Sequence, residues 1–182
     1  DANGSVLPIE HLFSPGDGTI WTAGPGYLAQ LDPASGDVLY HSQCLADPFQ
    51  RPIGQTADGS VWLCSAQGLT AVALTEAWQP LETGEPSLPA EPTVLLEASD
   101  GTLWLGTQAG LYYAQGHPPA MPWKLTSGLR SQAVRALAEG PEGTLWVGFP
   151  SGLARFDGTR WQVLTTRDGL PANDIRALLV AR

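Results

Sequence analysis

The chain has 182 residues, a formal net charge of -9, and 43% hydrophobic residues. This acidic balance, with no basic stripe, argues against nucleic acid as a partner and is explained most simply by solubility. No apolar segment approaches the roughly 18 residues of a membrane span, and no signal peptide is visible. If the protein is exported, its signal peptide has been removed and DANGS is a processed start. The 21 Gly, 16 Pro and 7 Trp favour short strands and turns.

A short motif recurs four times along the chain, each time around a tryptophan. The copies read DGTIWTAG, DGSVWLCS, DGTLWLGT and EGTLWVGF, and their tryptophans are 41, 42 and 42 residues apart. This spacing predicts four copies of one unit. The tryptophans are Trp21, Trp62, Trp104 and Trp146.

Two further sets of equivalent positions, called columns below, recur with the same spacing. An apolar residue precedes each motif and recurs a fifth time near the C-terminal end, while a glycine follows each motif. We therefore expect repeats at approximately 6–46, 47–88, 89–130 and 131–171, and an extra strand at 172–182 that opens a fifth repeat. The apolar column is Leu12, Ile53, Leu95, Leu137 and Leu178, and the glycine column is Gly26, Gly68, Gly110 and Gly152.

Each repeat is expected to contain four short strands. An apolar run such as TVLLEA leads to an Asp-Gly or Glu-Gly turn, whose residues tolerate the positive φ angles of a tight hairpin. The second run, such as TLWLGT, is apolar on both faces, as in a strand covered on both sides. The third begins at a Gly-Leu pair, and PWKLT and RWQVLTT are examples of the fourth. Antiparallel four-stranded repeats of about 40 to 45 residues are typical of an all-β propeller.

The repeated tryptophan is predicted to pack between neighbouring blades. A single blade cannot bury both of its faces, so blades stack face to face and large aromatic side chains fill the space between them. Gly106 and Gly148, two residues after the tryptophan, would leave room for the neighbouring sheet. Ala23 and Cys64 stand at the same place in the first two repeats.

The motif D-G-x-x-W-x-G-T, followed by G-L and by D-G-L-P, resembles the two-component regulator propeller repeat. The resemblance covers essentially the whole chain and is strongest in residues 88–182, which contain TSGLRSQAVRALAEG and RDGLPANDIRALLVA. The first repeat, with GYLAQLDPASGDVLYH, is more similar to quinoprotein propeller repeats. The resemblance implies the extracytoplasmic sensing region, periplasmic or secreted, of a bacterial membrane-anchored histidine kinase or a related signalling protein.

Three arrangements could protect the predicted extra strand, which would otherwise present an unpaired edge. The chain could be a fragment of a longer propeller, two copies could complete one ring, or the last strand could close the ring by displacing the first. We favour a fragment or subunit of a larger ring of about six to eight blades.

No catalytic, cofactor or metal site is predicted. The histidines His11, His41 and His117 do not repeat in register, and the motifs G-x-S-x-G, H-E-x-x-H and paired C-x-x-C are absent. One carboxylate per turn falls short of the oxygen ligands that calcium requires, so the turn acids are expected to form hairpins. These acids are Asp17, Asp58, Asp100 and Glu142.

One column at the start of the inner strands carries three arginines. In a ring they would form a positive throat suited to an anionic small molecule or an acidic glycan. Alternatively, the arginines cap the strands or pair with acids such as Glu139 on a neighbouring blade. The candidate ligand-binding residues are Glu10, Arg51, Thr93, Arg135 and Arg176, together with His11 beside Glu10.

Cysteines and outer tryptophans each allow two interpretations. Cys44 and Cys64 could form one disulfide in an oxidising compartment, or Cys64 could serve as a small buried hydrophobe. Trp78, Trp123 and Trp161, on fourth strands, could stack on sugar rings, although packing at the blade rim is the simpler expectation.

The sequence favours a non-enzymatic binding module that presents loops and a channel to a ligand. The second hypothesis is an assembly scaffold that binds proteins or self-associates, which would expose apolar loop residues such as Phe49 and those at 118–122. The third is a propeller lyase of the streptogramin type or a glycan-cleaving enzyme. It would need an acid and base pair in the throat, where only Glu10 with His11 is a candidate.

Overall fold

Strands make up almost all of the regular structure. The computed structural model describes residues 9, 11–14, 18–24, 27–42, 51–65, 68–72, 80–81, 90–115, 123–129 and 132–180. Within them, four antiparallel sheets of four strands follow one another along the chain. Two short 3-10 segments, Pro141–Gly143 and Thr166–Asp168, complete the described elements.

Each sheet is built from four consecutive strands, ordered from first to last. The first contains β1 His11–Phe13, β2 Ile20–Gly24, β3 Tyr27–Leu31 and β4 Val38–Ser42. The second contains β5 Arg51–Gln55, β6 Val61–Ser65, β7 Gly68–Val72 and β8 Pro80–Leu81. The third contains β9 Pro92–Glu97, β10 Thr102–Thr107, β11 Gly110–Gln115 and β12 Lys124–Leu125. The fourth contains β13 Ala136–Glu139, β14 Leu145–Phe149, β15 Gly152–Phe156 and β16 Trp161–Leu164.

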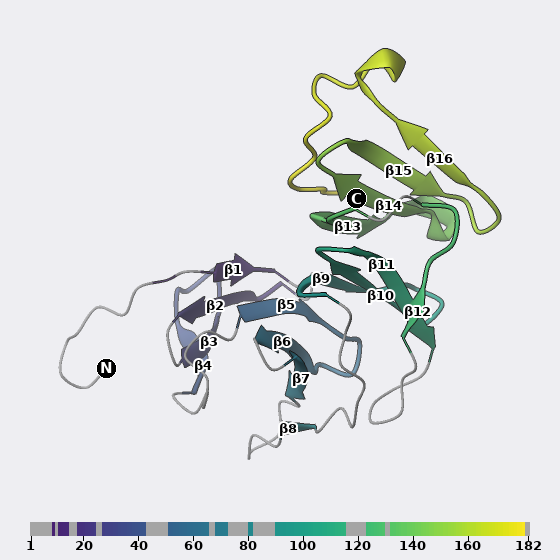
Figure 1. Ribbon diagram of the computed structural model, residues 1–182. Helices are drawn as coiled ribbons and strands as arrows, with labels where there is room; N and C mark the ends of the chain where they lie inside the picture. Colours follow the sequence, from purple (N-terminus) through teal and green to yellow (C-terminus); the bar gives the residue numbers. More distant parts are fainter. Residues whose placement is uncertain are drawn as a thin grey trace.

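The four sheets form an arc with their first strands on the inner side. Figure 1 shows β1, β5, β9 and β13 towards the inside of the arc and the later strands of each sheet towards its outside. Contacts join β1 to β5, β5 to β9 and β9 to β13. This is the arrangement of β-propeller blades, so the predicted fold class is confirmed.

The Asp-Gly turns have the backbone geometry that the sequence predicts. Gly59 and Gly101 adopt φ angles of 85° and 79°. The preceding acids stabilise their own turns: Asp58 Oδ1 accepts from the Ser60 N–H at 2.9 Å, and Asp100 Oδ1 accepts from the Thr102 N–H at 2.8 Å. These two carboxylates are therefore used within their hairpins, as local turn-forming side chains.

The repeated tryptophans lie between successive sheets. The first three pack with the two apolar residues that flank the next tryptophan along the chain, so one hydrophobic layer fills each of the three spaces between sheets. The clusters join Trp21 with Val61 and Leu63, Trp62 with Leu103 and Leu105, and Trp104 with Leu145 and Val147.

The glycines that follow two of these tryptophans admit a side chain from the next repeat. A Cβ added at Gly106 would stand 2.6 Å from Val134 Cγ1, and one added at Gly148 would stand 2.7 Å from Ile175 Cγ2. Such separations are far shorter than ordinary carbon contacts of about 3.5 to 4.0 Å. Glycine at these positions therefore allows close packing of consecutive repeats.

The segment after the fourth sheet differs in part from its prediction. Ile175 donates its N–H to Phe149 O at 2.9 Å, which places the segment beside the fourth sheet. The described residues 172–180 of the extra strand predicted at 172–182 contain no regular strand, so this strand stays a prediction. Leu179 is consequently 94% exposed.

Candidate ligand-binding site

Two of the predicted arginines meet at one carboxylate. Arg135 Nη1 lies 2.7 Å from Asp174 Oδ1, and Arg176 Nε lies 2.9 Å from Asp174 Oδ2. The side chains of Arg135 and Asp174 are each 39% exposed and that of Arg176 is 78% exposed. The cluster is therefore accessible to solvent and to an anionic ligand.

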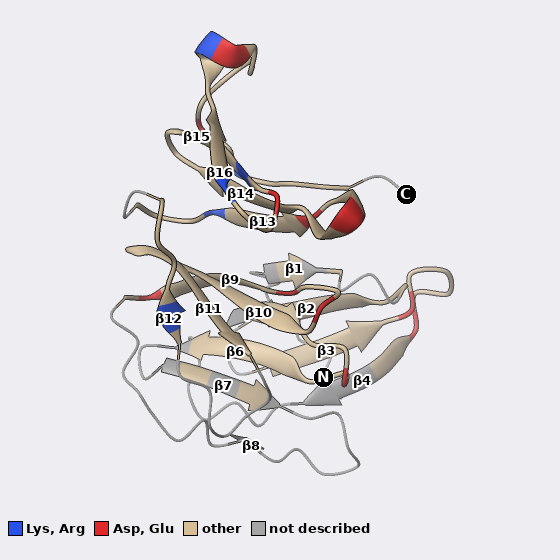
Figure 2. Ribbon diagram, turned by 90° about the vertical axis from the view of Figure 1, so that its right-hand side faces the viewer, with Lys and Arg blue, Asp and Glu red and all other residues tan. Residues whose placement is uncertain are grey.

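The backbone places these groups opposite one another. Arg135 directly precedes β13, and its N–H donates to Gly148 O at 2.9 Å. Asp174 directly precedes Ile175, whose side chain rests on Gly148. Both residues thus approach the same glycine of β14 from two inner segments. Figure 2 shows blue on β12 and beside β13 on one side of the sheets, while most of the red lies on the other side.

The other residues of the predicted column are not brought into this cluster. Thr93 Oγ1 instead donates to the backbone oxygen of Val134 at 2.8 Å, a neutral contact between the third and fourth repeats. Arg51 and His11 lie in β5 and β1, but their side chains are outside the described part of the structure, as is all of Glu10. Glu139 does not pair with an arginine, because its carboxylate binds Ser99 at 2.8 and 2.6 Å.

Sequence reasoning missed Asp174, although the repeats contain a signal for it. Arg135 is followed 39 residues later by Asp174, and Arg51 is followed 40 residues later by Glu91 at the equivalent position. Where the arginine is replaced by Thr93, the equivalent position is Ala133. An acid therefore accompanies each of these two arginines in the next repeat.

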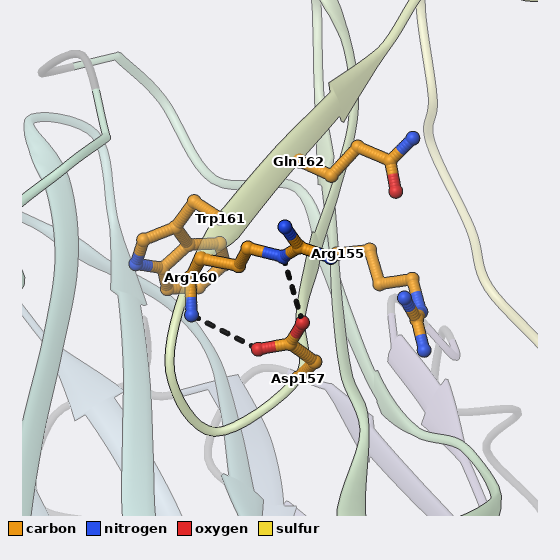
Figure 3. Close-up of a pocket in the computed structure, with 5 residues that line it drawn as sticks. All are labelled: Arg155, Asp157, Arg160, Trp161 and Gln162. Atoms are coloured by element: carbon orange, nitrogen blue, oxygen red, sulfur yellow. Dashed lines mark hydrogen bonds and ion pairs between the residues drawn. The ribbon is translucent and has the colours of Figure 1, made fainter.

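A hollow lies apart from this cluster at the β15–β16 hairpin, on the outer part of the fourth sheet. It has a volume of about 310 Å³ and is lined by Arg155, Asp157, Arg160, Trp161 and Gln162 (Figure 3). Asp157 accepts hydrogen bonds from the Thr159 hydroxyl at 2.7 Å and from the Arg160 backbone N–H at 2.9 Å. Its second oxygen lies 3.3 Å from Arg160 Nε. These bonds, with that of the Thr159 hydroxyl foremost, hold the pKa of the Asp157 carboxyl well below its usual range.

The aromatic groups near this hollow are engaged in packing. Trp161 stacks on Phe156 with ring centroids 4.7 Å apart, towards the third sheet. The Arg155 guanidinium lies 5.9 Å from the Trp146 ring centroid. Trp123 is partly buried against the cluster between the second and third sheets, and Trp78 lies outside the described residues. Rim packing thus accounts for Trp123 and Trp161.

The remaining candidate groups give no further site among the described residues. No cluster of three or more His, Cys, Asp or Glu side chains there could hold a metal ion. Cys64 is buried with Sγ 3.6 Å from Pro92 O, whereas Cys44 is not described, so the disulfide stays a prediction. His117 and the side chain of His41 are also outside the described part. No helix in the described ranges is long and apolar enough to cross a membrane.

The stacked four-stranded sheets define this chain as a β-propeller, and comparison with known proteins specifies the repeat. Residues 128–150 match the family model described as two component regulator propeller. The predicted recognition of this repeat is therefore confirmed. No curated protein sequence matches the chain.

Solved structures similar to this chain include extracellular domains assigned to two component and one component systems, and a lyase. The extracellular domain assigned to the hybrid two component system BT3049 of B. thetaiotaomicron is 20% identical, with a TM-score of 0.68 over 94% of this chain and 25% of that one. The domain assigned to the one component system BT4673 of the same organism is 18% identical, with a TM-score of 0.69 over 97% and 26%.

An inactive virginiamycin B lyase from Staphylococcus aureus is 14% identical, with a TM-score of 0.67 over 97% of this chain and 61% of that one. The present chain thus spans about a quarter of the two extracellular-domain chains and three fifths of the lyase. At these sequence identities the similarity establishes the propeller fold. Function has to be inferred from the residues of the candidate site.

Proposed function

We propose that this chain is part of a non-enzymatic, ligand-binding β-propeller in the extracytoplasmic sensing region of a bacterial signalling protein. The observation that carries the proposal is the convergence of Arg135 and Arg176 on the two oxygens of one carboxylate. This arrangement of donors around a carboxylate supports an anion as the ligand. Its ligand would be a small carboxylate, a phosphate or an acidic glycan.

Arginine is suited to this task because its planar guanidinium offers several N–H donors in a fixed arrangement. With Asp174 included, the cluster carries one net positive charge on a chain with a net charge of -9, which favours the approach of an anion. For the binding to act as a signal, the ligand must have different affinities for two states of the sensor. The sensor domains among the similar structures support this setting.

An assembly role is the second candidate, and the exposed side chain of Leu12 favours it. Leu12 is 65% exposed, whereas its equivalents Ile53 and Leu95 are 8% and 5% exposed within the cluster between the second and third sheets. Leu12 is therefore an exposed apolar side chain at a position that is covered in the next two sheets. A larger ring, formed by further blades or by a second copy, would bury this side chain.

The test of the ligand-binding proposal is calorimetric titration with succinate, inorganic phosphate and glucuronate at low salt. We expect at least one probe to bind, and the double variant Arg135→Ala/Arg176→Ala to abolish that binding. The matched control is Arg160→Ala/Arg167→Ala, which removes the same charge from exposed arginines that form no ion pair with Asp174 in the described part of the chain. Equal binding by both double variants would show that general charge, and not this site, attracts the anion.

A further inference from the structure

We propose that Asp174 is a positioning residue of the anion site, which holds the guanidinium groups of Arg135 and Arg176 while the ligand binds beside it. This inference rests on the proposed anion-binding function and adds how the site is organised. Each oxygen of Asp174 accepts from one arginine, through Arg135 Nη1 and Arg176 Nε. The two guanidinium groups are therefore held on a shared partner before any ligand arrives.

Asp174 occupies only part of what the two arginines offer. A guanidinium group carries N–H donors on all of its nitrogen atoms, and each arginine uses one nitrogen for Asp174. Among the contacts between described residues, Arg135 thus keeps Nε and Nη2, and Arg176 keeps Nη1 and Nη2. Adjacent N–H donors match an anion that presents two oxygens, as carboxylates and phosphates do. Such a ligand can bind without displacing Asp174.

The backbone gives Asp174 a fixed place. The next residue, Ile175, donates its N–H to Phe149 O at 2.9 Å, and its side chain lies against Gly148. Arg135 is anchored at the same end of β14, because its N–H donates to Gly148 O at 2.9 Å. Asp174 is thus a short side chain on an anchored backbone, whereas an arginine side chain is long and loses more rotamer freedom when it is ordered.

Arg176 illustrates what Asp174 contributes. The Arg176 side chain is 78% exposed, and within the described ranges its ion pair is with Asp174. An exposed arginine without such a partner samples many rotamers, and ordering it at the moment of ligand binding reduces the affinity. With Asp174 in place, part of this ordering is complete before the ligand binds.

The sequence repeats the pairing of arginine with an acid, but not the second arginine. Arg51 is followed 40 residues later by Glu91, at the position equivalent to Asp174. Where the column has Thr93 in place of an arginine, the equivalent position is alanine. Two residues beyond Glu91 stands Thr93, whereas two residues beyond Asp174 stands Arg176. The combination of one acid with two arginines, which leaves a net positive charge, is therefore particular to Asp174.

The experiment measures the affinity for succinate and for inorganic phosphate by calorimetry at low salt, in the wild-type chain, Asp174→Asn and Asp174→Ala. We expect both variants to bind the probe about two- to fivefold more weakly, the size expected when exposed ion pairs order the two arginines in advance. General charge predicts the opposite, because each variant makes the cluster more positive. Glu142→Gln, which makes the same change in net charge on an exposed turn, should leave the affinity unchanged.

A second readout distinguishes positioning from a general loss of structure. Nitrogen relaxation of the arginine Nε–H groups should show Arg135 and Arg176 to be more mobile in ligand-free Asp174→Asn than in the ligand-free wild type. Saturation with the probe should reduce this difference. Urea unfolding should give nearly the same stability for both proteins, since exposed ion pairs contribute little to it.

The outcomes separate this inference from the proposed function. If the wild type binds a probe through Arg135 and Arg176, but the Asp174 variants bind it equally or more tightly, Asp174 does not position the site and the proposed function stands. If the wild type binds no probe, both are overturned. Weaker binding by the variants without a change in arginine mobility would also overturn the positioning role.

Discussion

The Glu139 carboxylate binds Ser99 of the preceding sheet twice, accepting from its backbone N–H at 2.8 Å and from its hydroxyl at 2.6 Å. Glu97 repeats the link one sheet earlier, where it accepts from the Ala57 N–H at 2.6 Å. An acid on each of these inner strands thus holds the hairpin turn of the sheet before it. The fourth turn has Pro141 at the position of Ser99, and proline has no N–H to donate.

This link should have a measurable energy of its own. We expect Glu139→Ala and Ser99→Ala each to destabilise the protein, with a coupling of about 0.5–1 kcal/mol in a double-mutant cycle measured by urea unfolding. The value is small because Ser99 is exposed. Glu142→Gln serves as the control for net charge. Additive single effects would mean that the two groups stabilise the fold independently.

Gly106→Ala should destabilise the protein by about 1–3 kcal/mol through overpacking. The new methyl group would meet Val134, which is fully buried, and Val94 Cγ1 at 2.8 Å. Gly148→Ala should cost less, because Ile175 belongs to a segment with few attachments and can shift. Both values come from chemical denaturation. Val134→Ala, combined with Gly106→Ala, should recover part of the loss, and failure of this rescue would contradict the packing account.

The tryptophans should differ in their contribution to stability according to what covers them. Trp62 is buried between the second and third sheets, and its indole N–H donates to Thr56 Oγ1 at 3.3 Å. Trp62→Ala should therefore cost about 3–5 kcal/mol. Trp146→Ala should cost less, because Trp146 is only partly buried and the Arg155 guanidinium lies over its ring. The two free energies of unfolding, compared in one buffer, test this order.

The β15–β16 hairpin should keep its geometry to unusually low pH. The pKa of Asp157 is lowered in the folded state, so its stabilising effect is complete above the ordinary aspartate value of about 3.9 and is lost only as pH falls through the depressed value. Thr159→Ala should raise this pKa towards its ordinary value, because the Thr159 hydroxyl is the largest cause of the shift. Carboxyl carbon chemical shifts followed against pH would measure it. An unchanged midpoint in the variant would assign the shift to other donors.

The fold could be predicted from the sequence because the same structural unit, with the same packing residues, occurs four times. The tryptophan and glycine columns report packing that recurs in every repeat, and the third strands begin at Gly68, Gly110 and Gly152 as expected. Hairpin turns were equally predictable, since Asp-Gly has few alternatives in a tight connection. The extra strand expected at 172–182 stays a prediction, because a strand needs a paired neighbour and Ile175 forms only one backbone hydrogen bond to the fourth sheet, to Phe149 O.

The candidate site was harder to predict because it depends on one junction between repeats. Arg135 belongs to a column, but its partner Asp174 lies in the connection before the next inner segment, where residues vary from repeat to repeat. Glu139 was the nearer acid in the sequence, and its binding to Ser99 follows from the register of two sheets. The sequence pattern of a repeat identifies which residues lie on the inner strands. The residues with which they pair depend on how neighbouring sheets pack together.

The most direct test of the binding role observes the side-chain Nε–H signals of Arg135 and Arg176 by NMR while succinate is added. The account predicts that these two signals shift together and saturate, while those of Arg160 and Arg167 stay in place. Uniform small shifts of all four arginines, without saturation, would show that succinate acts only through general electrostatics and would contradict a ligand site at Arg135 and Arg176.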